Sequence, residues 1–395
     1  MPVSRRGFLT SLGAGGAGIA ALPLIGARGR EALYALPPLP QNAPVPSGLR
    51  RRDRMMASMA GMIRIDSNEN PDGPGRRVLE AMHSTFSESN RYPLQLEQAL
   101  IDAIAKSHGV KPENILLGCG SGEILRVAVK ALTAADRALV NPVPTFESAA
   151  NYAKFLGSPV RPVPVDRKLN LDLGAMADAS RGAGLVYFCN PNNPTATVHG
   201  ASDVASFIEQ VGKSSPNTFV LVDEAYHEFV AKPEYKTAVP IALANPQVIV
   251  SRTFSKIFGL AGMRVGYAIG QPATLSRMSG WVMDSNVTQL SLAAAITAVS
   301  DRDRIATEQK RNHATRDFTT KFFENAGYTV AKSDANFLMV DIRRDVRAFK
   351  TACLKQNVAV GRAFPPLMTQ LRVSFGTMDE MQAATKVFKA VLAEA

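Results

Sequence analysis

Short apolar runs recur along the chain from about residue 115, and segments with helical periodicity separate them. The runs are rich in β-branched residues and are bounded by turn formers, so each predicts a short buried strand. Strands that alternate with helices are typical of a mostly parallel sheet covered on both faces. The pattern therefore predicts an α/β fold, with strands near residues 115–118, 137–141, 185–189, 218–222, 247–251 and 265–269.

Two later apolar runs, at residues 336–340 and 371–375, predict strands of a second, smaller α+β domain. A chain of this length fits two domains. The small domain is expected to take residues from both ends of the chain. The expected boundaries are 62–91 for its N-terminal segment, 92–284 for the large domain and 285–395 for its C-terminal part.

Candidate chemistry begins with Lys256, which follows the strand expected at 247–251 and lies among Thr253, Ser255 and Arg264. Taken alone, a lysine near a strand end is more often a solvated surface residue. With these neighbours it suits an aldehyde cofactor that carries a phosphate. The amine forms a Schiff base with the aldehyde, while hydroxyls and guanidinium hold the phosphate.

Two more polar clusters follow apolar strands: Asp223 ends one of them, and the Asn/Pro-rich turn 190–195 follows another. Singly, the aspartate would be a helix cap and the turn an ordinary turn. A buried carboxylate is costly unless a cation pairs with it, and a protonated pyridine nitrogen is such a cation. Open α/β sheets bind ligands beyond the carboxyl ends of their strands. The three strand ends together therefore predict one cofactor site.

These motifs resemble those of the fold-type I pyridoxal-phosphate aminotransferases, and within them the histidinol-phosphate aminotransferase branch. The resemblance extends from about Ile63 to the C-terminus. It includes residues 66–71, 91–93, 118–123, 190–195, 223–226, 251–267 and 371–377. It implies a large domain with a mostly parallel seven-stranded sheet, a smaller α+β domain, and pyridoxal 5′-phosphate as cofactor.

The resemblance also implies a role for individual residues. Lys256 would hold the cofactor and move the substrate proton, Asp223 would pair with the pyridine nitrogen, and Tyr226 and Asn193 would bond the ring's phenolic oxygen. Phe146 would stack on the ring, although without the resemblance it reads as ordinary core packing. Most of the remaining expected contacts hold the phosphate, at the start of a helix expected from 123 to 131. These cofactor contacts are Ser121, Gly122, Glu123, Thr253, Ser255 and Arg264.

Two further implications concern the partner subunit and the substrate. Tyr92 resembles a tyrosine that reaches the phosphate of the neighbouring subunit, which implies a homodimer with shared active sites. Arg372 resembles the family's clamp for the substrate carboxylate or phosphate, a bidentate role that lysine does not imitate. Arg362 is either a second substrate contact or a solvated loop arginine. Ala196 stands where the family usually has glycine, so a glycine-only backbone conformation would be costly there.

The N-terminus carries a separate signal. Arg5 and Arg6 precede an aromatic residue, a leucine and a weakly apolar stretch from Leu12 to Ala27. This pattern predicts a twin-arginine signal peptide over 1–35, a Pro/Arg-rich linker over 36–61, and export to the periplasm by the twin-arginine machinery. An uncleaved membrane anchor is the alternative.

Composition narrows the function classes. The formal charge is +11, but residues 1–60 hold eight arginines and two acids and so supply six of these charges. The remainder has no basic run, which argues against a nucleic-acid partner. The three cysteines, Cys119, Cys189 and Cys353, have no metal-ligand spacing, so no metal site is expected.

The predicted activity is a ping-pong aminotransfer between an amino acid or amino-phosphate donor and a 2-oxo acid. Histidinol phosphate is an intermediate of the cytoplasm, so export argues for another donor. The stiff apolar loop from Phe364 to Met368 suggests an aromatic or bulky apolar amino acid. Two alternatives stay open: decarboxylation of a phosphorylated amino acid on the same scaffold, and a non-catalytic protein that binds pyridoxal phosphate.

Overall fold

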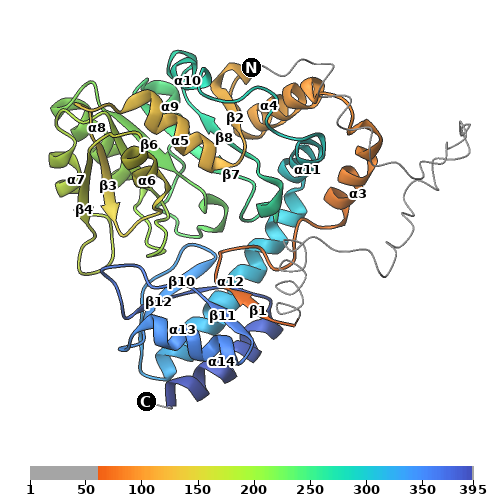
Figure 1. Cartoon of the computed structure of the whole chain (residues 1–395), viewed down its shortest axis with the longest axis vertical. Coiled ribbons are helices and arrows are strands. Elements are labelled where there is room, and N and C mark those ends of the chain that lie inside the picture. The colour runs from red at the N-terminus through yellow and green to blue at the C-terminus, as the bar shows by residue number, and fades with distance from the viewer. Residues whose placement is uncertain (1–60, 394–395) are drawn as a thin grey trace, which may run out of the picture. The chain divides into compact units, whose positions relative to one another are not determined.

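A seven-stranded sheet organises the larger part of the chain, here called the large lobe (Figure 1). The computed structural model describes residues 61–393. The strand order is β2-β8-β7-β6-β5-β3-β4, with β8 antiparallel to β2 and β7 and the other pairs parallel. The strands are β2 (Ile115–Gly118), β3 (Leu139–Val143), β4 (Val160–Pro164), β5 (Leu185–Cys189), β6 (Phe219–Asp223), β7 (Val248–Thr253) and β8 (Gly266–Ile269).

This architecture confirms the predicted fold class, and each of the six strands expected in the large domain is present. The seventh, β4, was not predicted by its own residues, because Pro162 and Pro164 interrupt the apolar run. Proline lacks the backbone donor that a central strand needs, so it is confined to sheet edges. β4 pairs with β3 and ends the strand order, which is such an edge.

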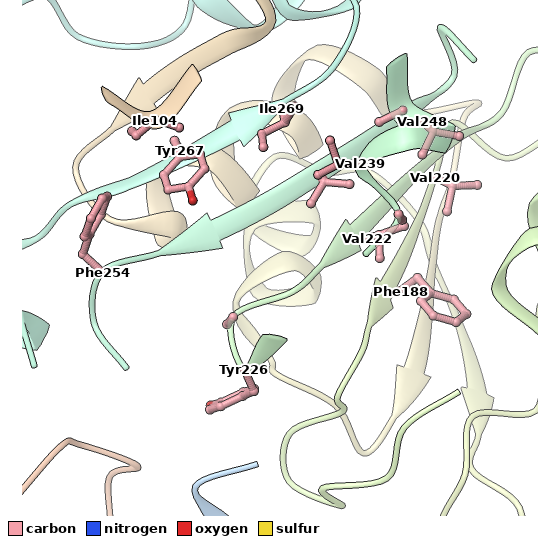
Figure 2. Close-up of a cluster of buried hydrophobic side chains, with 14 of the residues drawn as sticks. Ile104, Phe188, Val220, Val222, Tyr226, Val239, Val248, Phe254, Tyr267 and Ile269 are labelled. Carbon is pink, nitrogen blue, oxygen red and sulfur yellow. The ribbon is translucent and has the colours of Figure 1, made fainter. Parts of the chain in front are cut away.

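Alternating side chains of the strands face two separate cores. On one face, residues such as Phe188, Val220, Val222 and Val248 join helices α4, α7, α8, α9 and α11 (Figure 2). On the other, residues such as Leu185, Leu221 and Ile249 join α5, α6 and α10. The large-lobe helices are α4 (Leu94–His108), α5 (Ser121–Leu132), α6 (Ser148–Phe155), α7 (Leu173–Ala179), α8 (Ala201–Ser214), α9 (Val239–Ala244), α10 (Pro272–Ser279) and α11 (Gln289–Ser300).

A second group of elements, the small lobe, has its own core around Phe323, Phe349 and Phe388. β1 (Ile63–Ile65) pairs in parallel with β11 (Val358–Val360), and so joins the two ends of the chain. β12 (Gln370–Ser374), β10 (Phe337–Asp341) and β9 (Thr329–Val330) form an antiparallel sheet. The helices are α12 (Arg302–Asn325), α13 (Val346–Lys355) and α14 (Met378–Ala393).

Two helices pack differently from the division expected from the sequence. Val78 of α3 (Arg76–Ser84) and Leu292 of α11 are buried in the core of the large sheet. Both helices had been assigned to the small domain. α11 packs against both α3 and α4, so α3 and α11 belong to the large lobe.

The predicted signal, 1–35, and all but the last residue of the predicted linker, 36–61, lie outside the described residues. None of the helices between residues 61 and 393 combines the length and the apolar character that crossing a bilayer requires.

Candidate active site

A cavity of about 450 Å³ lies where β5, β6 and β7 end, and the small lobe contributes part of its wall. These three strands are parallel, so their carboxyl ends meet at one edge of the sheet, where open α/β sheets bind ligands. The cavity brings together twelve of the predicted site residues: Ser121, Gly122, Phe146, Asn193, Asp223, Tyr226, Thr253, Ser255, Lys256, Arg264, Arg362 and Arg372.

Lys256 lies in the loop after β7 with its amine directed into the cavity. Nζ donates a hydrogen bond to the carbonyl of Asn68 at 3.2 Å and lies 5.5 Å from the centre of the Tyr226 ring. Loss of hydration, reinforced by the positive charge of Arg372, lowers the pKa of Lys256 to about 8. A larger neutral fraction of this amine than of an ordinary lysine is therefore available near pH 8, as a nucleophile or a base requires.

Asp223 ends β6 and is buried, with one carboxylate oxygen bonded and one free. Tyr187 Oη donates to Asp223 Oδ2 at 2.7 Å, whereas Oδ1 is buried without a partner among the described residues. Loss of hydration raises the pKa of Asp223 to about 6, although the Tyr187 hydrogen bond acts in the opposite direction. A buried acceptor without a donor is costly. Oδ1 therefore fits a ligand with a cationic N–H group, such as a protonated pyridine ring.

Asn68 connects four polar groups around the lysine. Its amide donates to Tyr226 Oη at 3.1 Å and accepts from Ser374 Oγ at 2.8 Å. Its backbone carbonyl accepts from Lys256 and from Asn336. Because the Tyr226 oxygen already accepts a hydrogen bond from Asn68, its own hydroxyl hydrogen points elsewhere. Asn68 thereby favours Tyr226 as a hydrogen-bond donor toward the cavity.

An anion cradle lies at the start of α5. The first turn of this helix has no capping side chain, so its backbone N–H groups and dipole favour an anion there. Arg264 has φ +55°, and its Nη1 donates to Ser255 Oγ at 3.2 Å. Gly120, at φ +75°, lies so close to the Arg264 guanidinium that a Cβ atom would collide with it. The glycine therefore makes room for the arginine beside the helix start.

Arg372 lies on β12 and is buried at the cavity. Its Nη1 donates to Asn193 Oδ1 at 2.8 Å, its Nη2 donates to the Asp66 carbonyl, and Nε is buried without a partner among the described residues. Arg362 is half-exposed instead, and its Nη2 donates to Glu147 Oε2 at 2.6 Å. The structure therefore does not leave Arg362 simply solvated, but pairs it with a residue that the sequence had not singled out.

Phe146 lines the cavity and is 39% exposed. The alternative reading, that it packs in the core, is wrong. Ala196 is buried and adopts φ +62°, so this alanine takes up the left-handed conformation in which glycine is more common. Ala196 therefore adopts a conformation of the kind expected to be costly for a residue other than glycine.

Two predicted cofactor contacts are not brought into the cavity of this chain. The Glu123 carboxylate accepts hydrogen bonds from the backbone N–H of Cys119 and from Asn286, and Glu123 is not part of the cavity lining. Tyr92 is 84% exposed and lies outside the cavity lining. The expected contact between Tyr92 and the phosphate of a neighbouring subunit stays a prediction.

Sequence reasoning missed several residues of the cavity or its support. Tyr187 and Asn68 are the most consequential, because they bond Asp223 and Tyr226. Strand alternation could have found the tyrosine, since Tyr187 and Asp223 fall on one face of neighbouring strands. Others that line the cavity are Ser67, Glu69, Thr145, Glu147, Ser148 and Asn151.

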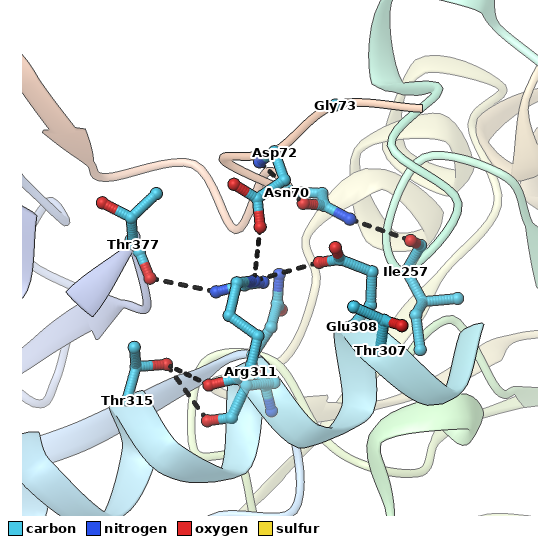
Figure 3. Close-up of polar contacts among 12 residues, drawn as sticks. Asn70, Asp72, Gly73, Ile257, Thr307, Glu308, Arg311, Thr315 and Thr377 are labelled. Carbon is cyan, nitrogen blue, oxygen red and sulfur yellow. Dashed lines mark hydrogen bonds and ion pairs between the residues drawn. The ribbon is translucent and has the colours of Figure 1, made fainter. Parts of the chain in front are cut away.

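The loop before α3 is held against the lysine loop by a polar network (Figure 3). Asn70 Nδ2 donates to the carbonyl of Ile257, the residue after the lysine, at 2.9 Å. Arg311 of α12 pairs with Asp72 at 3.2 Å and with the buried Glu308 at 3.0 Å. Buried charges with such partners fix the loop geometry, so the network positions the segment that carries Lys256.

Within residues 61–393, no group of three or more acidic, histidine or cysteine side chains is arranged to hold a metal ion. Cysteine contributes one cavity residue, Cys189. It is buried beside Asp223, and loss of hydration raises the pKa of its thiol well above the ordinary range. A thiol kept protonated in this way is a poor nucleophile. The start of α5, Arg264 and Arg372 give the cavity groups that suit an anionic ligand.

Comparison with known proteins agrees with this geometry. The family model of the class I and II aminotransferases matches residues 60–388. Histidinol-phosphate aminotransferase of Moorella thermoacetica is 32% identical over 92% of this chain and 93% of its own length, and histidinol-phosphate aminotransferase 2 of Ralstonia nicotianae is 34% identical over 85% and 90%. The crystal structure of histidinol-phosphate aminotransferase from Sinorhizobium meliloti in complex with pyridoxal-5′-phosphate superposes with a TM-score of 0.80. It is 25% identical and covers 94% of this chain and 99% of that one.

The bound cofactor of that structure, the family match and the free oxygen of Asp223 point the same way. The cofactor is pyridoxal 5′-phosphate, and the fold is that of the fold-type I enzymes which use it. The chain belongs to the class I and II aminotransferases and is a pyridoxal-phosphate-dependent transaminase.

Proposed function

We propose that the cavity binds pyridoxal phosphate through three groups of residues. Asp223 pairs through its free oxygen with the pyridine nitrogen. Tyr226 and Asn193 bond the phenolic oxygen, and Phe146 covers one face of the ring. The phosphate takes the cradle made by Ser121, Gly122, Thr253, Ser255 and Arg264. The observation that carries this proposal is Asp223 Oδ1, which has no partner within residues 61–393 and lies in the cavity that also holds the Lys256 amine.

Bound pyridoxal phosphate supplies an aldehyde that combines with amines and a ring that accepts the electron pair released at the donor's Cα. The chain supplies the remaining functions. Asp223 keeps the ring nitrogen protonated, because a buried carboxylate beside it stabilises the cation. Asn68 donates a hydrogen bond to the Tyr226 oxygen, which leaves the Tyr226 hydroxyl to donate a hydrogen bond toward the cavity.

Lys256 is proposed to act twice. Its amine first holds the cofactor, and a donor amine then displaces it. The freed amine would take the proton from the donor's Cα and deliver it to the carbon that carried the cofactor's aldehyde. With the 2-oxo acid acceptor it would move a proton in the opposite direction. Its pKa of about 8 suits both tasks, since a general base works best near the operating pH.

Arg372 is proposed to hold the anionic group of donor and acceptor. Arg372 is buried, and its Nε, which has no partner in the described part of the chain, is available for a charge-assisted hydrogen bond. The related enzymes are named for histidinol phosphate, which makes an amino-phosphate one candidate donor. An amino acid with an aromatic or bulky apolar side chain is the other, supported by Phe364 in the cavity wall.

The experiment is a donor panel with the loaded protein. Histidinol phosphate and the common amino acids are each mixed with it in the absence of an acceptor, and the absorbance change and the oxo product are measured. A transaminase converts its donor once per site and stops until a 2-oxo acid is added. Release of carbon dioxide instead would identify a decarboxylase, and a spectrum that no donor changes would identify a binding protein without turnover.

We further propose that the enzyme is a homodimer exported to the periplasm by the twin-arginine route. Support for the dimer is the exposed Tyr92 and, beside it, Leu94, which is 64% exposed. Support for export is Arg5 and Arg6 with the apolar stretch behind them. Light scattering of the purified protein tests the dimer, and replacement of both arginines by lysine followed by cell fractionation tests the export.

A further inference from the structure

An ion pair at the edge of the cavity joins the two lobes. Glu147 occupies the N-cap position of α6 in the large lobe, without a capping hydrogen bond from its side chain, and Arg362 lies between β11 and β12 in the small lobe. Arg362 Nη2 lies 2.6 Å from Glu147 Oε2, and both residues line the cavity. Their side chains are 47% and 54% exposed, and ion pairs this exposed contribute little to stability. The pair is therefore better understood by its effect on what enters the cavity.

Arg362 and Arg372 share one aromatic ring. The Arg362 guanidinium carbon lies 4.2 Å from the centre of the Phe364 ring, and that of Arg372 lies 4.9 Å from it. The nearby charge of Arg362 also lowers the pKa of Arg372, after the larger effect of burial. Two guanidiniums this close would together attract a ligand with two anionic groups. Glu147 supplies one of those two negative charges from within the protein.

We propose that Glu147 determines substrate specificity by occupying Arg362, so that the cavity selects donors and acceptors with one anionic group and a neutral side chain. This inference rests on the proposed transaminase function and on Arg372 as the anion contact. A substrate with a second carboxylate or a phosphate must displace Glu147 from Arg362 and then lie beside its carboxylate. A like charge placed against the wrong ligand is an established route to selectivity.

A neutral side chain meets a different environment. Phe364 lines the cavity, and the guanidinium of Arg362 is already turned toward Glu147. An aromatic or branched apolar side chain can therefore pack against Phe364 without disturbing the ion pair. The expected substrates are monocarboxylic amino acids with large neutral side chains, together with the matching 2-oxo acids.

The test uses the loaded enzyme and the variant Glu147→Gln, which keeps the shape of the side chain and removes its charge. We measure the dissociation constants of succinate and 3-phenylpropanoate as unreactive probes, and kcat/KM for glutamate, phosphoserine and phenylalanine. The variant should bind succinate about five- to tenfold more tightly, the effect of removing one half-exposed charge. The dissociation constant of 3-phenylpropanoate should change by no more than about twofold. For glutamate and phosphoserine, which carry a second anionic group, kcat/KM should rise mainly because KM falls.

Two further variants separate the explanations. The double variant Glu147→Gln with Arg362→Gln should lose the gain for succinate, because the gain requires a free Arg362. Glu80→Gln removes a carboxylate from an exposed pair with Arg76 on α3, away from the cavity, and should change neither probe. An unchanged ratio of succinate to 3-phenylpropanoate affinity in Glu147→Gln, with normal turnover of a neutral donor, overturns this inference alone. Absence of turnover with every donor in every variant overturns the proposed function, and this inference with it.

Discussion

Replacing Tyr187 by phenylalanine should make the stability of the cofactor-free protein more sensitive to pH. The tyrosine is fully buried and donates to Asp223 Oδ2 at 2.7 Å, and phenylalanine keeps the ring while it removes the donor. A hydrogen bond contributes about 1.5–3 kcal/mol when its acceptor is charged and about 0.5–1.5 kcal/mol when it is neutral. The variant should therefore lose about 1 kcal/mol of unfolding free energy at pH 4 and about 2 kcal/mol at pH 8.

The direction follows from the pKa of Asp223, which is about 6 in the folded protein against an ordinary value of 3.8. A carboxyl group with a raised pKa favours the folded state while it is protonated. Its contribution is complete below about pH 3.8 and is lost as the pH rises through 6, a change of about 3 kcal/mol. Loss of the Tyr187 hydrogen bond should raise the pKa of Asp223 by about one pH unit more and extend the loss to higher pH.

The assay is urea unfolding of the cofactor-free protein between pH 4 and 8.5. Wild type, Tyr187→Phe and Tyr152→Phe are compared, since Tyr152 is a partly buried tyrosine on α6 that loses the same oxygen. The destabilisation by Tyr187→Phe should grow with pH, whereas that by Tyr152→Phe should stay constant. A constant effect of Tyr187→Phe across the range would refute the link between Tyr187 and the charge of Asp223.

Two other substitutions test the cradle and the buried charges. Gly120→Ala should weaken pyridoxal phosphate binding at least tenfold, because the added Cβ displaces Arg264. The control is Gly109→Ala, which is also at positive φ but has open space around it. Both variants should lose about 1–2 kcal/mol of stability, but Gly109→Ala should leave the cofactor affinity unchanged. Equal affinities in fluorescence titrations of the two variants would contradict this account of the cradle. Glu224→Gln should cost about 3–5 kcal/mol in urea unfolding, because it leaves one side of the fully buried pair with Arg252 uncompensated. A cost under 1 kcal/mol would show that Glu228 alone compensates the arginine.

The sequence predicted the parts of the site that are recognisable from a residue and its neighbours in the chain. Lys256, Asp223 and the turn at 190–195 each follow an apolar strand, and parallel strands bring their carboxyl ends together. The sequence also predicted the strands whose residues form unbroken apolar runs. It failed at β4, where prolines that only an edge strand tolerates hide the pattern.

What the sequence could not predict depends on contacts between distant segments. Asn68 reaches Tyr226 across 158 positions, and Arg362 reaches Glu147 across 215. No pattern in the local sequence predicts contacts between residues so far apart in the chain. Glu123 failed for a related reason: its place at the helix start suggested a cofactor contact, but Asn286, 163 residues away, takes its carboxylate. Side-chain direction at such positions is set by packing and not by local pattern.

The measurement that tests the central claim most directly is borohydride reduction of the loaded protein followed by peptide mass mapping. Reduction makes the bond between the lysine amine and the cofactor aldehyde permanent, so the modified residue can be identified. The account predicts one added pyridoxyl phosphate per chain, on the peptide that contains Lys256, and none in a Lys256→Ala variant. Modification of a different lysine, or equal labelling of that variant, would contradict it.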